Sequence, residues 1–131
     1  MSIAVAYWCV FAAALLPYIW VGIAKAGGRR YDNRDPRGWL AKQDAPRSIR
    51  ANAAQLNAFE AFPAFAAGVI LADIAGVADE RIALLSVVFV AARIAHGLFY
   101  ITGQATLRSL AWLVGIACAF ALIAQAASAA A

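Results

Sequence analysis

The chain has 131 residues, of which 65% are hydrophobic, and a formal net charge of +4 at pH 7. Because soluble domains are only about 45–50% apolar, this composition excludes an ordinary soluble globule and indicates an integral membrane protein. Eight of the eleven Lys and Arg residues lie between Lys25 and Arg50, in one segment between apolar runs. This placement favours membrane topology and anionic lipid over nucleic acid as the reason for the positive charge.

The first apolar run covers residues 3–24, close to the roughly 20 residues that a helix needs to cross hydrocarbon. Ala24-Lys25-Ala26 resembles a signal-peptide cleavage site. However, no basic residue precedes the run, and the run is longer than the apolar part of a signal peptide. We therefore interpret it as a membrane span.

A polar, basic loop over residues 25–50 follows the first span. Gly27, Gly28 and Pro36 predict irregular backbone there. Pro46 fits the first turn of a helix. The second helix should therefore begin near Pro46 and protrude from the bilayer before its apolar part begins at about residue 56.

Three further apolar runs cover residues 56–75, 82–101 and 107–127. The links between them are short, so successive helices should be antiparallel neighbours. Asp79 and Thr106 are candidate N-caps for the third and fourth spans. The sequence thus predicts one all-α domain over residues 1–131, an up-down-up-down bundle of four transmembrane helices.

The positive-inside rule sets the expected orientation. We expect the 25–50 loop to lie in the cytoplasm and both termini to lie outside. Four tryptophans are candidate anchors at the membrane interfaces: Trp8, Trp20, Trp39 and Trp112. Cys9 and Cys118 lie in apolar runs without metal-ligand spacing, so we interpret them as small hydrophobic residues and expect no metal.

Polar side chains inside the spans indicate a functional site, because they are costly in a membrane. They are Asn57 and Glu60 in the second helix, Arg93, His96 and Tyr100 in the third, and Arg108 and Ser109 at the start of the fourth. The spacing within the second and third helices puts each set on one face. At 1.5 Å per residue, Glu60 lies roughly 6 Å past Leu56 and His96 roughly 8 Å before Ile101, so three helices bring polar groups to one level near the cytoplasmic face.

Such a cluster could bind a polar anion at the edge of an apolar bundle. Glu60 and Arg93 can pair, and Arg108 near a helix N-terminus favours an anion. A bound thiolate would be stabilised by Arg108 and the Ser109 hydroxyl. Each residue also has a purely structural interpretation: a buried ion pair, a satisfied core histidine, an interface tyrosine or a topology-setting arginine.

Three segments resemble the MAPEG family, the membrane-associated proteins of eicosanoid and glutathione metabolism. Residues 55–63, QLNAFEAFP, resemble its N-x-x-E signature, and residues 93–100, RIAHGLFY, resemble its R-x-x-H-x-x-x-Y helix. Residues 107–109, LRS, resemble the R-S start of its fourth helix. All three motifs occur in order on the expected helices. Separately, residues 31–37, YDNRDPR, are similar to the bacterial branch, which implies a bacterial inner-membrane protein.

The resemblance implies a homotrimer with glutathione bound between adjacent subunits near the cytoplasmic face. Asn57, Glu60, His96 and Tyr100 would hold glutathione, with Arg93 bracing Glu60. Arg108 and Ser109 would stabilise its thiolate. Leu56 stands where the eicosanoid-forming and transferase members carry an arginine, and Ala105 and Thr106 stand where those members carry a basic residue.

We therefore expect a glutathione-dependent membrane enzyme, of the transferase or peroxidase type, acting on lipophilic electrophiles or peroxides. The alternative is a non-catalytic membrane scaffold or lipid-binding protein with the same fold, which the missing arginine at Leu56 favours. A small transporter is a third interpretation. The confinement of the polar cluster to one membrane face argues against it.

Overall fold

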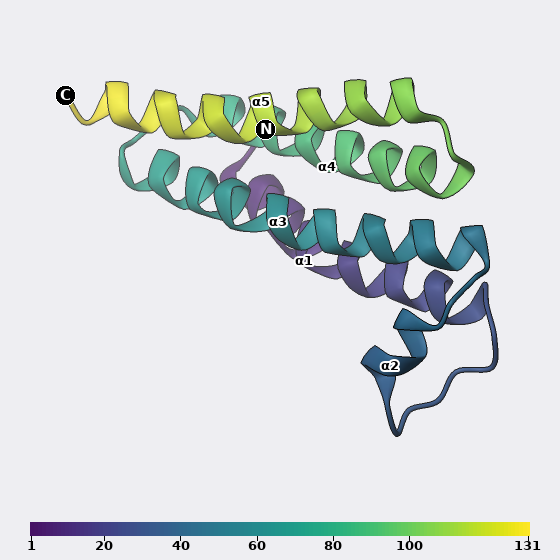
Figure 1. The fold of residues 1–131 in the computed structure, drawn as a ribbon. Helices are drawn as coiled ribbons and strands as arrows, with labels where there is room; N and C mark the ends of the chain where they lie inside the picture. The colour runs from purple at the N-terminus through teal and green to yellow at the C-terminus, as the bar shows by residue number, and fades with distance from the viewer.

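The computed structural model describes residues 1–131, which form helices and no strand. Four helices are long and apolar enough to cross a membrane. They are α1 (Ile3–Ala26), α3 (Pro46–Ile74), α4 (Asp79–Thr102) and α5 (Ala105–Ala129). Successive long helices run in opposite directions (Figure 1). The predicted all-α, four-helix bundle is confirmed.

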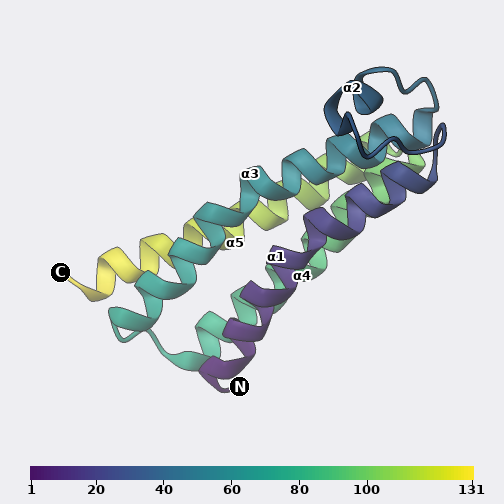
Figure 2. The same ribbon diagram turned by 90° about the horizontal axis from the view of Figure 1, so that it is seen from below.

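Helices α3 and α4 form the centre of the bundle. They contact each other, and each contacts both α1 and α5, whereas α1 and α5 lie on opposite sides. Both termini lie at one end of the bundle, and the segment with the short helix α2 lies at the other (Figure 2). We call these ends the terminal face and the loop face, the latter defined by residues 27–45.

Small and aromatic side chains build the core between these helices. Phe65 of α3 and Phe89 of α4 are fully or almost fully buried, and their rings stack with centroids 3.8 Å apart. A Cβ atom at Gly68 of α3 would lie 3.0 Å from Cβ of Leu122 on α5. Close approach at small residues is how helices pack in membranes, where dispersion contacts replace the hydrophobic driving force.

The loop face contains a helix that the sequence analysis missed. Pro36 was expected in irregular backbone, but it begins α2 (Pro36–Ala41). Asp35 caps this helix by accepting a hydrogen bond from the Gly38 backbone N–H at 3.0 Å. Proline suits a helix start because its missing N–H has no acceptor there and its φ is already helical.

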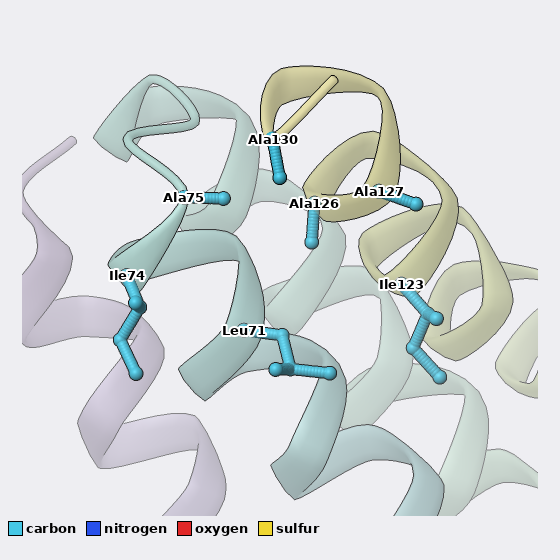
Figure 3. Close-up of a pocket in the computed structure, with 7 residues that line it drawn as sticks. All are labelled: Leu71, Ile74, Ala75, Ile123, Ala126, Ala127 and Ala130. Atoms are coloured by element: carbon cyan, nitrogen blue, oxygen red, sulfur yellow. The ribbon is translucent and has the colours of Figure 1, made fainter.

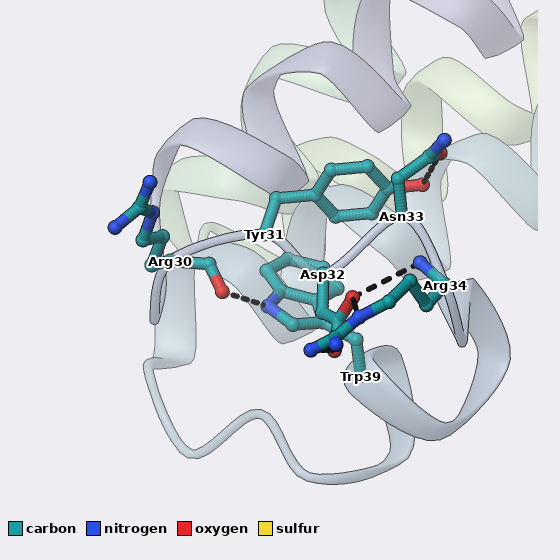
Figure 4. Close-up of polar contacts among 6 residues, drawn as sticks. All are labelled: Arg30, Tyr31, Asp32, Asn33, Arg34 and Trp39. Carbon is teal, nitrogen blue, oxygen red and sulfur yellow. Dashed lines mark hydrogen bonds and ion pairs between the residues drawn. The ribbon is translucent and has the colours of Figure 1, made fainter.

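Aromatic and amide side chains fix the rest of the loop (Figure 4). The Tyr31 ring meets the Trp39 ring edge-on at 5.1 Å, and the Trp39 indole N–H donates to the Arg30 carbonyl at 2.8 Å. The Gln43 side chain donates to the Trp39 carbonyl and accepts from the Arg29 N–H. The segment is therefore a folded unit on the loop face.

Two exposed ion pairs join residues within this unit. Arg29 donates to Asp44 at 2.6 Å, and Arg34 donates to Asp32. Each guanidinium lowers the pKa of the carboxyl that it contacts. Because these pairs are exposed, we expect them to contribute little to stability.

The helix starts agree only partly with the sequence. Pro46 is the first residue of α3, as predicted. The N-cap predictions were wrong: the caps of α4 and α5 are Ala78 and Gln104. Asp79 is instead the first residue of α4, and its carboxylate accepts from the Ile3 N–H at the terminal face.

Two of the four tryptophans are not exposed anchors. Trp20 is buried with 4% exposure because its indole packs on Gly97 of α4, where a Cβ would overlap it. Trp39 is buried inside the loop unit. Trp8 and Trp112 are 70% and 43% exposed, so these two are available for the membrane interface.

Candidate functional site

One face of α4 carries the central residues of the site. Arg93, His96 and Tyr100 follow one another at helical spacing, and Arg93 and His96 are each only 3% exposed. A buried cation and a buried imidazole need polar partners, since unpaired burial is costly. Helices α3 and α5 contact the two ends of this row, but only α3 supplies a hydrogen-bond acceptor.

Asn57 of α3 supplies the partner at one end. The Arg93 Nη2 atom donates to Asn57 Oδ1 at 2.7 Å, and Asn57 Nδ2 donates to Glu60 Oε2 at 3.2 Å. We expected a direct pair between Glu60 and Arg93, but no direct ion pair is present. One amide instead links the buried cation to the carboxylate, because its two polar ends bond to groups of opposite charge.

Gly115 of α5, which the sequence analysis did not single out, leaves space for Arg93. A Cβ atom at this position would lie 3.3 Å from Arg93 Cδ. Tyr100 and Arg108 also meet across α4 and α5, and each lies seven residues closer to the connecting turn than Arg93 and Gly115, respectively. An antiparallel register of α4 and α5 would have identified this glycine.

Arg108 of α5 supplies the contact at the other end of the row. Its guanidinium carbon lies 4.6 Å from the centre of the Tyr100 ring, and the Tyr100 ring meets the His96 ring edge-on at 5.5 Å. Arg108 makes no ion pair or hydrogen bond through its side chain. His96 Nδ1 is buried without a hydrogen-bond partner. This end of the row therefore has a free cation and an unused polar atom.

Glu60 lies at the surface of α3, beside a small pocket between α3 and α5. The pocket has a volume of about 140 Å³ and is lined by Asn57, Glu60, Ala61, Trp112 and Ile116. Its α3 wall is partly polar and its α5 wall is apolar. Trp112, expected only as an interface anchor, thus also borders the candidate site.

Ser109 does not join the other site residues. Its hydroxyl donates to the Ala105 carbonyl at 3.0 Å, and it lines a separate groove on α5 with Leu110 and Leu113. Leu56, in the position of the family arginine, is 55% exposed. Six of the seven predicted site residues therefore contact another member of the group. They form two sets that meet on α4: Asn57, Glu60 and Arg93 in one, and His96, Tyr100 and Arg108 in the other.

A pocket lined only by hydrophobic residues lies at the terminal face (Figure 3). It has a volume of about 530 Å³ between the ends of α3 and α5. Leu71 and Ile74 line it from α3 and Ile123 lines it from α5. None of its lining side chains is polar and none belongs to the candidate site, so we assign it to the apolar exterior of the bundle.

Comparison with known proteins gives one match. The model of the MAPEG family matches residues 5–128. No curated protein and no solved structure matches the chain significantly. The match includes the loop unit, α3 and α4 in full, and all but the outermost residues of α1 and α5.

Proposed function

The chain belongs to the MAPEG family, and from this premise we propose that it is a glutathione-dependent membrane enzyme that conjugates or reduces lipophilic electrophiles or peroxides. The family includes glutathione-dependent transferases and peroxidases, and its members commonly use glutathione. The four apolar helices agree with a lipid environment that delivers an apolar substrate.

The observation that carries the proposal is the free cation at Arg108. Its guanidinium rests on the Tyr100 ring and has no carboxylate partner. About one helical turn before Tyr100 on α4, the His96 ring meets the Tyr100 ring edge-on. The buried His96 Nδ1 atom has no hydrogen-bond partner in the chain. A cation held in place without a counter-ion favours an anionic ligand, and an unpaired buried nitrogen favours a ligand with a hydrogen-bonding group.

We assign the following roles. Asn57, Glu60, His96 and Tyr100 bind the peptide groups of glutathione, and Arg93 positions Asn57 and Glu60 through the hydrogen bonds described above. Arg108 stabilises the glutathione thiolate, since a nearby cation favours the deprotonated thiol. The thiol proton passes to water. Ser109 can add a hydrogen bond to the sulfur only if its hydroxyl leaves the Ala105 carbonyl.

The thiolate then attacks a lipophilic substrate. With an electrophilic carbon, a sulfur–carbon bond forms and the leaving group departs with its electron pair. With a hydroperoxide, the sulfur attacks the terminal oxygen and the O–O bond breaks. The glutathione sulfenic acid forms, and the departing alkoxide takes a proton from water to become the alcohol. A second glutathione reduces the sulfenic acid to the disulfide and water. Preorganised positive charge at the sulfur favours the thiolate over the thiol, so a larger share of bound glutathione is in its reactive form.

We also propose a homotrimer oriented with its loop face in the cytoplasm of a bacterium. Glu60 is exposed within the apolar length of α3, and an exposed carboxylate facing lipid is unfavourable. A second copy of the chain or bound glutathione would cover it. Native mass spectrometry that finds three copies supports this assembly, and a monomer contradicts it.

Turnover with generic probes tests the enzymatic proposal. Purified protein in detergent receives glutathione with chlorodinitrobenzene or cumene hydroperoxide. We expect Arg108→Ala to lower kcat/KM by about 10–100-fold, the range for a lost charge-assisted contact of roughly 1.5–3 kcal/mol. Arg81→Gln, which removes an exposed arginine near the terminal face, serves as the control. Equal activity of all three proteins would refute the role of Arg108.

Two observations favour a second candidate, a non-catalytic scaffold or lipid-binding protein. Leu56 occupies the position of the family arginine, and the Ser109 hydroxyl is engaged by the backbone. This candidate predicts no turnover of either probe and no loss of stability in Arg108→Ala. Glutathione-dependent turnover by the unmodified protein would exclude it.

A further inference from the structure

A second pocket opens at the loop face where α1, α3 and α4 meet. It has a volume of about 640 Å³ and shares no residue with the candidate site. Its lining residues are Ile23, Pro46, Arg47, Arg50, Leu98, Ile101 and Thr102. We call it the arginine pocket. The volume lies within the range of small-molecule sites.

Arg47 and Arg50 are the charged residues of this pocket, and neither makes a hydrogen bond or an ion pair through its side chain. Both lie against glycines. A Cβ at Gly27 would lie 3.5 Å from Arg47 Cγ, and a Cβ at Gly103 would lie 2.6 Å from Arg50 Nη1. Arg47 and Arg50 thus lie three residues apart on α3, both are exposed, and both line the pocket.

No carboxylate of this chain is available to neutralise these two arginines. In the loop, Asp44 and Asp32 pair with other arginines and Asp35 caps α2. Glu60 accepts from Asn57, about 15 Å along α3 from Arg50 at 1.5 Å per residue. The remaining acidic residues lie at or near the terminal face: Asp73, Asp79 and Glu80. A counter-ion must therefore come from outside the chain.

The start of α3 adds partial positive charge to the same pocket. Pro46 is the first residue of the helix and lines the pocket, and the N-cap residue Ala45 provides no side-chain cap. The first N–H groups of a helix lack acceptors within it, and its dipole favours an anion at this end. Helix N-termini with free N–H groups are suited to phosphate.

Apart from Thr102, whose hydroxyl donates to the Leu98 carbonyl, the remaining walls of the pocket are apolar. Ile23 of α1 and Leu98 and Ile101 of α4 form them, and Leu98 is 51% exposed. A soluble anion would leave these walls in contact with water. A molecule with an anionic head and an acyl tail would satisfy both the arginines and the apolar walls.

We infer that the arginine pocket is a binding site for the phosphate headgroup of an anionic membrane phospholipid, held by Arg47, Arg50 and the N-terminus of α3. Guanidinium groups bind phosphate oxygens in a bidentate manner. The first part of an acyl chain lies along Leu98 and Ile101. This inference is independent of glutathione and of the proposed enzymatic activity.

The test is a lipid titration of delipidated protein in neutral detergent, without glutathione, read out by native mass spectrometry. Phosphatidylglycerol should bind saturably and phosphatidylcholine should bind at least about tenfold more weakly, since each arginine near a membrane surface attracts anionic lipid. Soluble glycerol phosphate should not displace the bound lipid. Displacement at equal concentration would indicate a soluble anion and overturn the assignment, as would equal binding of the two lipids.

A pair of double variants locates the site. Arg47→Gln with Arg50→Gln should weaken phosphatidylglycerol binding by about tenfold or more. Arg30→Gln with Arg37→Gln removes the same charge from the loop face but outside this pocket, and should change binding by less than about twofold. Equal losses in both double variants would mean that general positive charge, and not this pocket, attracts the lipid. If the first double variant fails to fold, the lipid comparison and the glycerol phosphate competition on the unmodified protein still decide the question.

Discussion

Arg93 of α4 donates a hydrogen bond to Asn57 of α3 across 2.7 Å, and this contact joins the two central helices of the bundle through a buried cation. The Asn57 side-chain amide in turn donates a hydrogen bond to the Glu60 carboxylate. A guanidinium that is 3% exposed depends on this single side-chain acceptor. The same amide therefore affects both stability and the shape of the candidate site.

Asn57→Ala should destabilise the protein by about 1–3 kcal/mol, because it leaves the Arg93 guanidinium buried without its acceptor. The measurement is the free energy of unfolding in mixed micelles. Asn52→Ala is the matched control, since Asn52 lies on the same helix and makes no side-chain hydrogen bond to the bundle. Equal stability of the two variants would contradict a structural role for the Asn57 amide.

Gly97→Ala should destabilise the bundle by about 1–3 kcal/mol, the usual cost of overpacking. The new methyl group would overlap the Trp20 indole, which is buried and packed on this glycine. Gly22→Ala on α1 is the control, because a Cβ there meets nothing within 4 Å. Its effect should be neutral or stabilising, since alanine favours helix over glycine by about 1 kcal/mol. A Gly97→Ala protein as stable as Gly22→Ala would show that α1 and α4 do not pack in this way.

Tyr100→Leu should lower the glutathione-dependent kcat/KM by about 2–5-fold, which corresponds to the roughly 0.5–1 kcal/mol of a partly exposed cation–π contact. The physical reason is that the Tyr100 ring holds the Arg108 guanidinium. Tyr100→Phe keeps the ring and loses only the hydroxyl. If the ring positions Arg108, the phenylalanine variant stays closer to the unmodified enzyme than the leucine variant. The reverse order would assign the main role to the hydroxyl.

The Asp44 carboxyl should titrate below its ordinary pKa, because Arg29 stabilises its charged form. A pKa that is lower in the folded state adds stability above the unfolded value of about 3.9, and this stability is lost as pH falls through the folded value. In an NMR titration of the side-chain carboxyls, Arg29→Gln should raise the Asp44 pKa and leave Asp32 unchanged, since Asp32 pairs with Arg34. An unchanged Asp44 would contradict the Arg29 contact.

The four helices were predictable because their apolar runs and short links leave few alternatives. The helix starts were less so. Asp79 resembles an N-cap in sequence, yet its carboxylate accepts a hydrogen bond from the Ile3 N–H. The two residues are 76 positions apart, so no local sequence pattern could predict this contact. Helix α2 depends on the Asp35 cap and on the edge-on contact between Trp39 and Tyr31. Its six residues are too few to show a helical periodicity of apolar positions in the sequence.

The sequence predicted which residues make up the candidate site, but not which of them contact one another. Helical spacing placed Arg93, His96 and Tyr100 on one face of α4. It could not indicate that Arg93 bonds to Asn57 and not to Glu60, because both lie on the same face of α3. Gly115 gave no signal by itself. The direction in which Ser109 points depends on the rotation of α5 about its own axis. This helix is apolar on nearly all sides, so its sequence does not determine that rotation.

The central claim is that Arg108 stabilises a glutathione thiolate, and an ultraviolet difference titration with glutathione tests it most directly. The detergent-purified protein and the Arg81→Gln control should each develop a saturable thiolate band, and Arg108→Ala should show none. No band in the unmodified protein at millimolar glutathione, or an equal band in Arg108→Ala, would contradict the claim.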